Sequence, residues 1–249
     1  MSECVYIFQS MTKMPKYKVA SLILFVGLYS SAVVAQEIQV IDDFERYEEN
    51  EPPFRWKIPD RASRSMLPIL SDHEKPNEFM TVVKDGNGNV LRAYTQNEAV
   101  QLALPQGDGL DWNILMYPRL RWRWRADVLP EGAMEDTRSL NDTGAAVYVA
   151  FACNDWLGRP CTIKYTYSSS LPEGTRAKYG KLHVVVASSG VESMGEWVEV
   201  DRNVLEDFRM IFDRQPPGNP IYIMVWNDSD TTNGESDVYF DDILISTVE

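Results

Sequence analysis

The strictest pattern in this chain is the alternation at 119–128, which reads RLRWRWRADV. Arginine occupies every second position from 119 to 125, and apolar side chains occupy the positions between them. A two-residue period places successive side chains on opposite faces, which is the geometry of a half-buried β-strand. A helix would spread these arginines around its axis, so the pattern predicts a strand whose apolar face packs against a second layer.

The same extended pattern recurs along the rest of the chain. Segments that alternate or are rich in Val, Ile and Tyr predict further strands. These are 37–42, 79–83, 91–95, 99–104, 145–151, 162–167, 182–188, 221–226 and 237–245. Turn sequences such as DGNGN and PPGNP separate several of them.

One helix is predicted at 203–212. Asn203 suits the N-cap position, Glu206 follows three residues later, and Leu205, Phe208 and Phe212 form an apolar face. Many strands with a single helix, without regular strand–helix alternation, predict an all-β fold. We expect a two-sheet antiparallel sandwich (a jelly roll) with one short α-helix.

The N-terminus has the features of a secretory signal peptide. Three lysines at 13–18 precede an apolar segment at 20–28, and small residues end at Ala35. A membrane anchor is the alternative, but the apolar segment is shorter than the roughly 20 residues that a span needs. We expect residues 1–35 to be a signal peptide and 36–249 to be a single β-sandwich domain. This domain would be periplasmic or extracellular, with no stable membrane span.

Two cysteines lie beyond the predicted signal peptide, at the ends of the loop CNDWLGRPC. Cysteine pairs in exported proteins are commonly oxidised. A metal site is the alternative, but no histidine or further cysteine lies nearby to complete it. We therefore expect a disulfide between Cys153 and Cys161.

The acidic charge restricts the partners. The formal net charge is −13 at pH 7 and the sequence pI is about 4.7. Nucleic acids and anionic membranes would repel such a chain, because both are bound through basic surfaces. We expect no nucleic-acid partner.

The arginine row and the aromatic residues suggest a ligand site. A row of guanidinium groups on one strand face could bind an acidic polysaccharide. The alternative is a ladder of ion pairs with carboxylates on neighbouring strands. For the ligand site we expect one open sheet face that carries Arg121, Arg123 and Arg125, with Tyr148 and Trp226 as stacking platforms.

Two acidic groups offer oxygen ligands for a structural calcium ion. The first joins the two ends of the chain and consists of Asp42, Asp43, Glu45, Asp241 and Asp242. The second lies in one loop and consists of Asn227, Asp228, Asp230, Thr232 and Asn233. The alternative is that these residues are solvated and form turns.

Catalytic motifs are sparse. The chain has two histidines, His73 and His183, which excludes a multi-histidine zinc site, and it has no nucleophile-elbow motif. The sequence Glu199-Val200-Asp201 is similar to the start of a concanavalin-like glycosidase strand, but no further glutamate follows. Carboxylate pairs for glycoside hydrolysis are available in any acidic protein, so none is singled out.

Three stretches resemble one bacterial secreted family, the domain of unknown function 3047. They are 120–151, 195–212 and 221–243. This family has no assigned activity, so the resemblance implies no site. The segments DDFE at 42–45 and FDDI at 240–243 are also similar to the ends of carbohydrate-binding jelly rolls.

The sequence favours an exported, non-catalytic binding module for a glycan or cell-envelope polymer. One alternative is a carbohydrate-active enzyme, a hydrolase or lyase, on the same jelly-roll scaffold. The other is a structural envelope protein without a small ligand.

Overall fold

The computed structural model describes residues 36–60, 62–63, 65–70, 72–153 and 158–248. The predicted signal peptide lies outside these residues. The elements are β1 (Ile38–Asp42), β2 (Lys57–Asp60), β3 (Ser65–Pro68), β4 (Glu78–Asp85), β5 (Gly88–Gln96), β6 (Ala99–Pro105), β7 (Arg119–Val128), η1 (Arg138–Leu140), β8 (Thr143–Phe151), β9 (Cys161–Ser168), β10 (Arg176–Tyr179), β11 (Leu182–Ser189), η2 (Val191–Ser193), β12 (Val198–Asn203), α1 (Val204–Phe212), β13 (Pro220–Asp228) and β14 (Glu235–Ser246).

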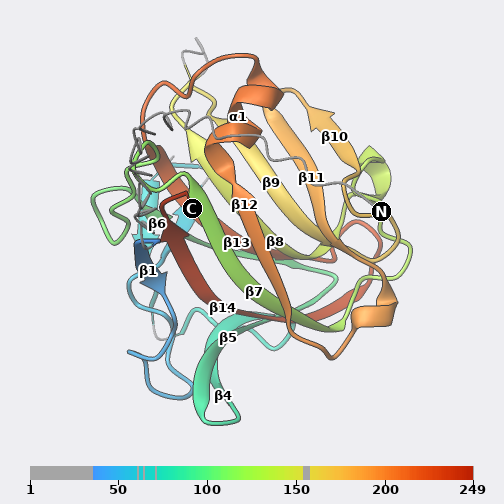
Figure 1. Ribbon diagram of the computed structural model, residues 1–249. Helices are drawn as coiled ribbons and strands as arrows, with labels where there is room; N and C mark the ends of the chain where they lie inside the picture. Colours follow the sequence, from blue (N-terminus) through green and yellow to red (C-terminus); the bar gives the residue numbers. More distant parts are fainter. Residues whose placement is uncertain (1–35, 61, 64, 71, 154–157, 249) are drawn as a thin grey trace, which may run out of the picture. The chain divides into compact units, whose positions relative to one another are not determined.

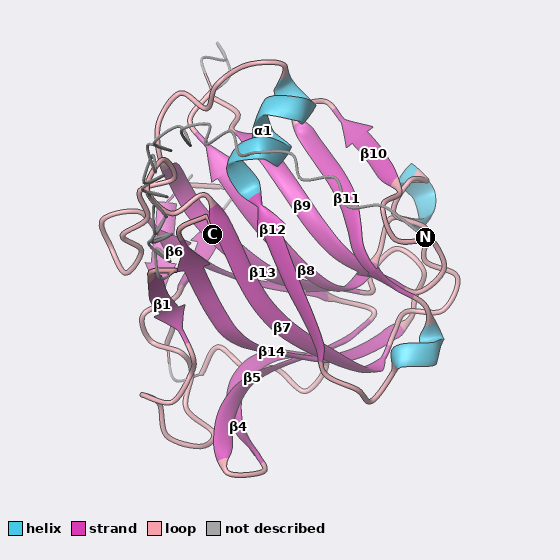
Figure 2. Cartoon of the chain, viewed as in Figure 1, coloured by secondary structure: helices cyan, strands magenta, loops and turns pink. Residues whose placement is uncertain are grey.

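The strands form two facing sheets (Figures 1 and 2). Sheet A has the order β12-β7-β14-β5-β4, and β1 also pairs with β14. Sheet B has the order β10-β11-β9-β8-β13-β6-β2-β3. Among the strand pairs described, β9 and β11 run parallel and the others run antiparallel. The predicted all-β, two-sheet jelly roll is confirmed.

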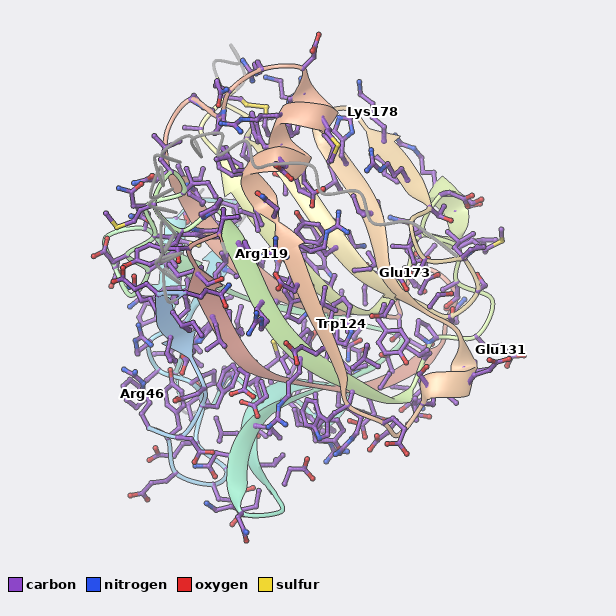
Figure 3. The ribbon with its side chains drawn as sticks, in the orientation of Figure 1. Arg46, Arg119, Trp124, Glu131, Glu173 and Lys178 are labelled. Carbon is purple, nitrogen blue, oxygen red and sulfur yellow. A yellow bond between two sulfur atoms is a disulfide. The ribbon has the colours of Figure 1, made fainter. Side chains whose placement is uncertain are left out.

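The core lies between the two sheets and explains the alternation at 119–128. Trp122 and Trp124 of β7 are fully buried, and their ring centroids lie 5.5 Å and 5.8 Å from those of Tyr165 and Tyr167 on β9. Figure 3 shows Arg119 and Trp124 on the same strand, β7. Strand β7 therefore presents indoles to the core and guanidinium groups to the outer face of sheet A.

Helix α1 agrees with the prediction for 203–212. The Asn203 side chain accepts a hydrogen bond of 3.1 Å from the backbone N–H of Glu206, which caps the first turn. Phe208 is buried, and its ring centroid lies 4.6 Å from that of Phe151 on β8. The apolar face of the helix therefore closes one part of the core.

The predicted disulfide is present between Cys153 and Cys161, with a Cα–Cα distance of 5.5 Å. Arg214 Nη2 lies 2.8 Å from the sulfur of Cys153. In the described part of the chain, no helix has the length and apolar character needed to cross a membrane.

Candidate functional site

The arginines of β7 form a ladder of ion pairs across the outer face of sheet A. The neighbouring strands β12 and β14 and the ends of β4 and β7 supply the carboxylates. The pairs are Arg119–Asp201 at 2.9 Å, Arg121–Asp201 at 3.2 Å, Arg121–Glu199 at 3.3 Å, Arg123–Asp241 at 2.5 Å, Arg123–Asp242 at 3.0 Å, Arg125–Asp85 at 2.9 Å and Arg125–Asp127 at 2.9 Å. Of the two interpretations of the row, this geometry matches the ion-pair ladder.

Trp197 also covers part of the ladder. Its ring centroid lies 4.7 Å from the guanidinium carbon of Arg123 and 5.3 Å from that of Arg125. Its indole N–H donates to Asp85 at 2.9 Å. These guanidinium groups are thus engaged by both carboxylates and an aromatic face, which leaves them poorly suited to a further anionic ligand.

The structure does not bring the five predicted ligand residues together. Arg121, Arg123 and Arg125 lie on the outer face of sheet A, whereas Tyr148 and Trp226 lie on β8 and β13 of sheet B. The expectation of one shared face is therefore wrong. The two-residue period shows which side of a strand a residue occupies, but not which strands share a sheet.

The first predicted calcium cluster is also dispersed. Asp42 is buried and accepts hydrogen bonds from Tyr47 Oη at 2.6 Å and Trp56 Nε1 at 2.9 Å. Asp241 and Asp242 instead pair with Arg123 on the outer face. Although Asp42 lies opposite Ile243 in the β1–β14 pair, its side chain points into the core.

No set of three carboxylates with oxygens within 4.8 Å of one another forms at the chain ends, within the described residues. This finding includes Asp43 and Glu45, the other two members of the predicted cluster. Calcium itself stays a prediction.

The second predicted cluster is only partly assembled. Carboxylate oxygens of Asp142, Asp228 and Asp230 lie within 4.8 Å of one another. Asn227 is not part of this group, because its buried amide donates to the carbonyl of Ala93 at 2.8 Å. Asp142 was not predicted, and it comes from the loop before β8.

Both Asp142 oxygens already accept hydrogen bonds. Asp142 Oδ1 accepts from the backbone N–H of Thr231 at 3.0 Å, and Oδ2 accepts from that of Thr232 at 2.7 Å. Asp142 therefore holds the β13–β14 loop in place through two backbone amides.

The outer face of sheet B carries an aromatic pair. The rings of Tyr148 and Trp226 are stacked, with centroids 5.4 Å apart and an interplanar angle of 29°. Tyr148 also lies opposite Lys164 in the β8–β9 pairing, and the Lys164 ammonium lies 5.6 Å from the tyrosine ring centroid. The adjacent strands β8, β9 and β13 therefore place a cation and two aromatic rings close together on one face, with Trp226 diagonal to Tyr148 because it pairs with Ala146.

A pocket of about 360 Å³ opens beside these three side chains. Its lining residues, which come from β8, β9, β10, β11, β13 and three loops, are Glu135, Asn141, Tyr148, Lys164, Tyr179, Leu182, Val184, Trp226, Asp228, Asp230 and Thr231. We call it the sheet B pocket. The lining combines aromatic and aliphatic side chains with charged and polar ones, so it can contact both the apolar and the polar groups of a ligand.

Three ionisable groups of the sheet B pocket have pKa values that burial shifts. Burial raises the pKa of Asp228 to about 7, while the nearby Lys164 lowers it and the charges of Asp230 and Asp142 raise it further. Burial also raises the pKa of Glu135 and lowers the pKa of Lys164. Such perturbed groups in a cleft are characteristic of functional sites.

Sequence reasoning missed Lys164, Glu135 and Tyr179. The sequence held a signal for Lys164, because this lysine interrupts the otherwise uncharged segment TIKYTY at 162–167. In the structure, the strand that contains it has no exposed residue. Glu135 had none, because it lies in an acidic loop whose path depends on the tertiary structure.

Comparisons with known proteins give one family and several solved structures. The sequence model of the family described as "Protein of unknown function (DUF3047)" matches residues 68–244. No protein with curated annotation matches the chain.

Three solved structures illustrate the likeness. The family 30 carbohydrate-binding module of a Clostridium thermocellum cellulosomal cellulase is 14% identical, with a TM-score of 0.39 over 71% of this chain and 86% of that chain. The CBM27-1 module of Caldicellulosiruptor saccharolyticus, in complex with mannohexaose, is 14% identical, with a TM-score of 0.33 over 71% and 86%. The family 12 xyloglucanase of Bacillus licheniformis is 10% identical, with a TM-score of 0.38 over 86% and 100%. Because the match to the family model covers most of the sequence, the chain belongs to the DUF3047 family.

Proposed function

We propose that this protein is an exported, non-catalytic module that binds a glycan or cell-envelope polymer on the outer face of sheet B. The observation that carries the proposal is the partly exposed indole of Trp226, which stacks on the buried Tyr148 ring at the wall of the sheet B pocket. Sugar rings pack their apolar C–H faces on aromatic side chains, while their hydroxyl groups need polar partners. Glu135, Lys164 and Asp228 supply such partners in the same pocket.

The outer face of sheet A is the weaker candidate. Each arginine of the ladder has a carboxylate partner, and Trp197 covers two of them. An anionic ligand would have to displace these carboxylates and leave them without a counter-charge, which is costly for the buried Asp241.

Export is supported by the bond between Cys153 and Cys161, because structural disulfides persist in oxidising compartments. The basic and apolar segments before residue 36 support the same conclusion. We propose a periplasmic or extracellular location.

Glycan binding can be tested with the exported protein on a glycan array, followed by calorimetry. We expect Trp226→Ala to weaken binding by about tenfold or more, because one stacking surface is lost. Trp197→Ala is the matched control, since it removes an indole that packs on the arginine ladder of sheet A, and it should leave the affinity unchanged. Loss of binding in the control alone would place the ligand on sheet A. If no glycan or envelope polymer binds at all, the structural-protein alternative would replace the proposal.

A carbohydrate-active enzyme is the second candidate, and one observation favours it. A carboxyl group with a pKa of about 7, as in Asp228, holds a proton under the conditions in which a general acid must donate one. Depolymerised product from a bound polysaccharide, absent with Asp228→Asn, would establish this activity. Binding without product supports the non-catalytic module.

A further inference from the structure

Two acidic side chains of the sheet B pocket have unused hydrogen-bonding capacity. Within the described residues, Glu135 Oε1 and Asp228 Oδ1 are buried and have no hydrogen-bond partner. Glu135 is 1% exposed, and its other oxygen accepts from Ser168 Oγ at 2.6 Å. A buried carboxylate oxygen without a donor is costly, so these two oxygens point to a ligand that brings N–H or O–H groups.

The charge of the pocket favours a cationic ligand. Among its described lining residues, Glu135, Asp228 and Asp230 are acidic, and Lys164 supplies the basic group. Lys164 already interacts electrostatically with Asp228, Glu135 and Asp142. One ammonium group shared among these carboxylates leaves a surplus of negative charge, which a second ammonium group would offset.

The aromatic residues of the pocket favour a cation that also has an apolar face. Tyr148, Tyr179 and Trp226 contribute aromatic rings. An aromatic face attracts both a cation and the apolar face of a sugar ring. A sugar with an amino group presents the two features in one unit.

We infer that the sheet B pocket binds an amino sugar unit with a free amine, whose ammonium group offsets the acidic charge of the pocket and whose N–H and O–H groups donate hydrogen bonds to Glu135 Oε1 and Asp228 Oδ1. This inference rests on the proposed function and names its ligand class. A divalent cation at the three aspartates is the competing occupant. The geometry favours the ammonium group, because Asp142 already accepts from two backbone amides and Lys164 lies among the same charges.

Calorimetry near neutral pH tests the inference with two matched probes, glucosamine oligomers and N-acetylglucosamine oligomers of equal length. We expect the free-amine oligomers to bind about tenfold more tightly. Asp228→Asn and Glu135→Gln should each remove most of this preference, because they delete the charge and keep the shape. Glu173→Gln, an exposed carboxylate outside the pocket, is the control and should leave the preference intact. Thermal melts of each variant show whether it is folded.

Lys164→Met distinguishes a cationic ligand from an anionic one. Binding of glucosamine oligomers should persist in this variant, because the ligand amine does not need the lysine. Binding of oligouronates by the native protein that is lost in Lys164→Met would overturn the inference.

Three further outcomes are decisive. Equal affinity for both oligomers, with loss in Trp226→Ala, would refute the amine preference and leave the proposed glycan binding in place. Saturable Ca²⁺ binding that disappears in Asp228→Asn, with no amine preference, would assign the pocket to a metal instead. If neither oligomer nor any other glycan binds, the proposed function itself fails.

Discussion

Lys164 of β9 lies directly opposite Tyr148 of β8, with its ammonium 5.6 Å from the tyrosine ring centroid, and both side chains are almost inaccessible to solvent. An ammonium group loses several kcal/mol of hydration when it is buried, so a lysine on the outer face of a sheet is normally exposed. Here the nearby Asp228, Glu135 and Asp142 offset part of that loss. The outer face of sheet B therefore holds a set of ionisable groups that simple packing does not require.

The first prediction concerns the pH dependence of stability. The pKa of Asp228 is about 7 in the folded protein and near 3.8 in the unfolded chain. Because the folded-state pKa is raised, the stabilising effect of the protonated carboxyl is complete below about pH 4 and is lost as the pH rises through 7. Asp228→Asn should therefore increase the free energy of unfolding by about 2–4 kcal/mol at pH 8, and by much less at pH 4.

Urea unfolding of both proteins at several pH values measures this effect. Glu173→Gln is a suitable control, because Glu173 is exposed and lies outside the sheet B pocket. A constant difference between Asp228→Asn and the native protein from pH 4 to pH 8 would show that Asp228 does not titrate in this range.

The second prediction separates two positions of the arginine ladder. Arg123→Ala leaves Asp241 without its cation, and the Asp241 side chain is only 5% exposed. We expect a loss of about 1–3 kcal/mol in the free energy of unfolding. Arg119→Ala removes a pair whose members are both near 30% exposed, so it should cost about 0–1 kcal/mol. Equal losses in the two variants, measured by urea unfolding, would contradict the importance of burial.

The strands were predictable where they are long and pack on the core. The alternation at 119–128 agrees with β7, because Trp122 and Trp124 are buried between the sheets. The four-residue strands β2, β3 and β10 were missed, because they are too short to show a period and two of them contain proline. The parallel pairing of β9 with β11 also has no local signal.

The site was less predictable than the fold, for a physical reason. Tyr148 and Trp226 were selected as aromatic platforms, and their stacking depends on the pairing of β8 with β13. The burial of Lys164 depends on Asp228 and Glu135, which are distant in the sequence. Ion pairing of the arginine row was one of the two interpretations of the sequence. Which carboxylates pair with the arginines depends on the strands that flank β7 in sheet A, and no local pattern gives that order.

The third prediction concerns the start of α1. Asn203→Ala removes the acceptor for the Glu206 N–H and should lower the free energy of unfolding by about 1 kcal/mol. Asn203→Asp keeps an acceptor at the same position and should retain most of the stability. Urea unfolding of the three proteins measures both effects. If the aspartate variant lost as much as the alanine variant, the role of the cap would be refuted.

The fourth prediction concerns the disulfide. The bond between Cys153 and Cys161 closes a short loop and restricts the unfolded chain. The double variant Cys153→Ala/Cys161→Ala should therefore lower the free energy of unfolding by about 2–3 kcal/mol. A reducing agent should lower the stability of the native protein by a similar amount and leave the double variant unchanged, as followed by urea unfolding. Since neither the two cysteines nor Arg214, which contacts their sulfurs, lines the sheet B pocket, we expect glycan affinity in the absence of urea to be the same for both proteins. A large loss of affinity in the folded double variant would show that the disulfide loop contributes to the binding site.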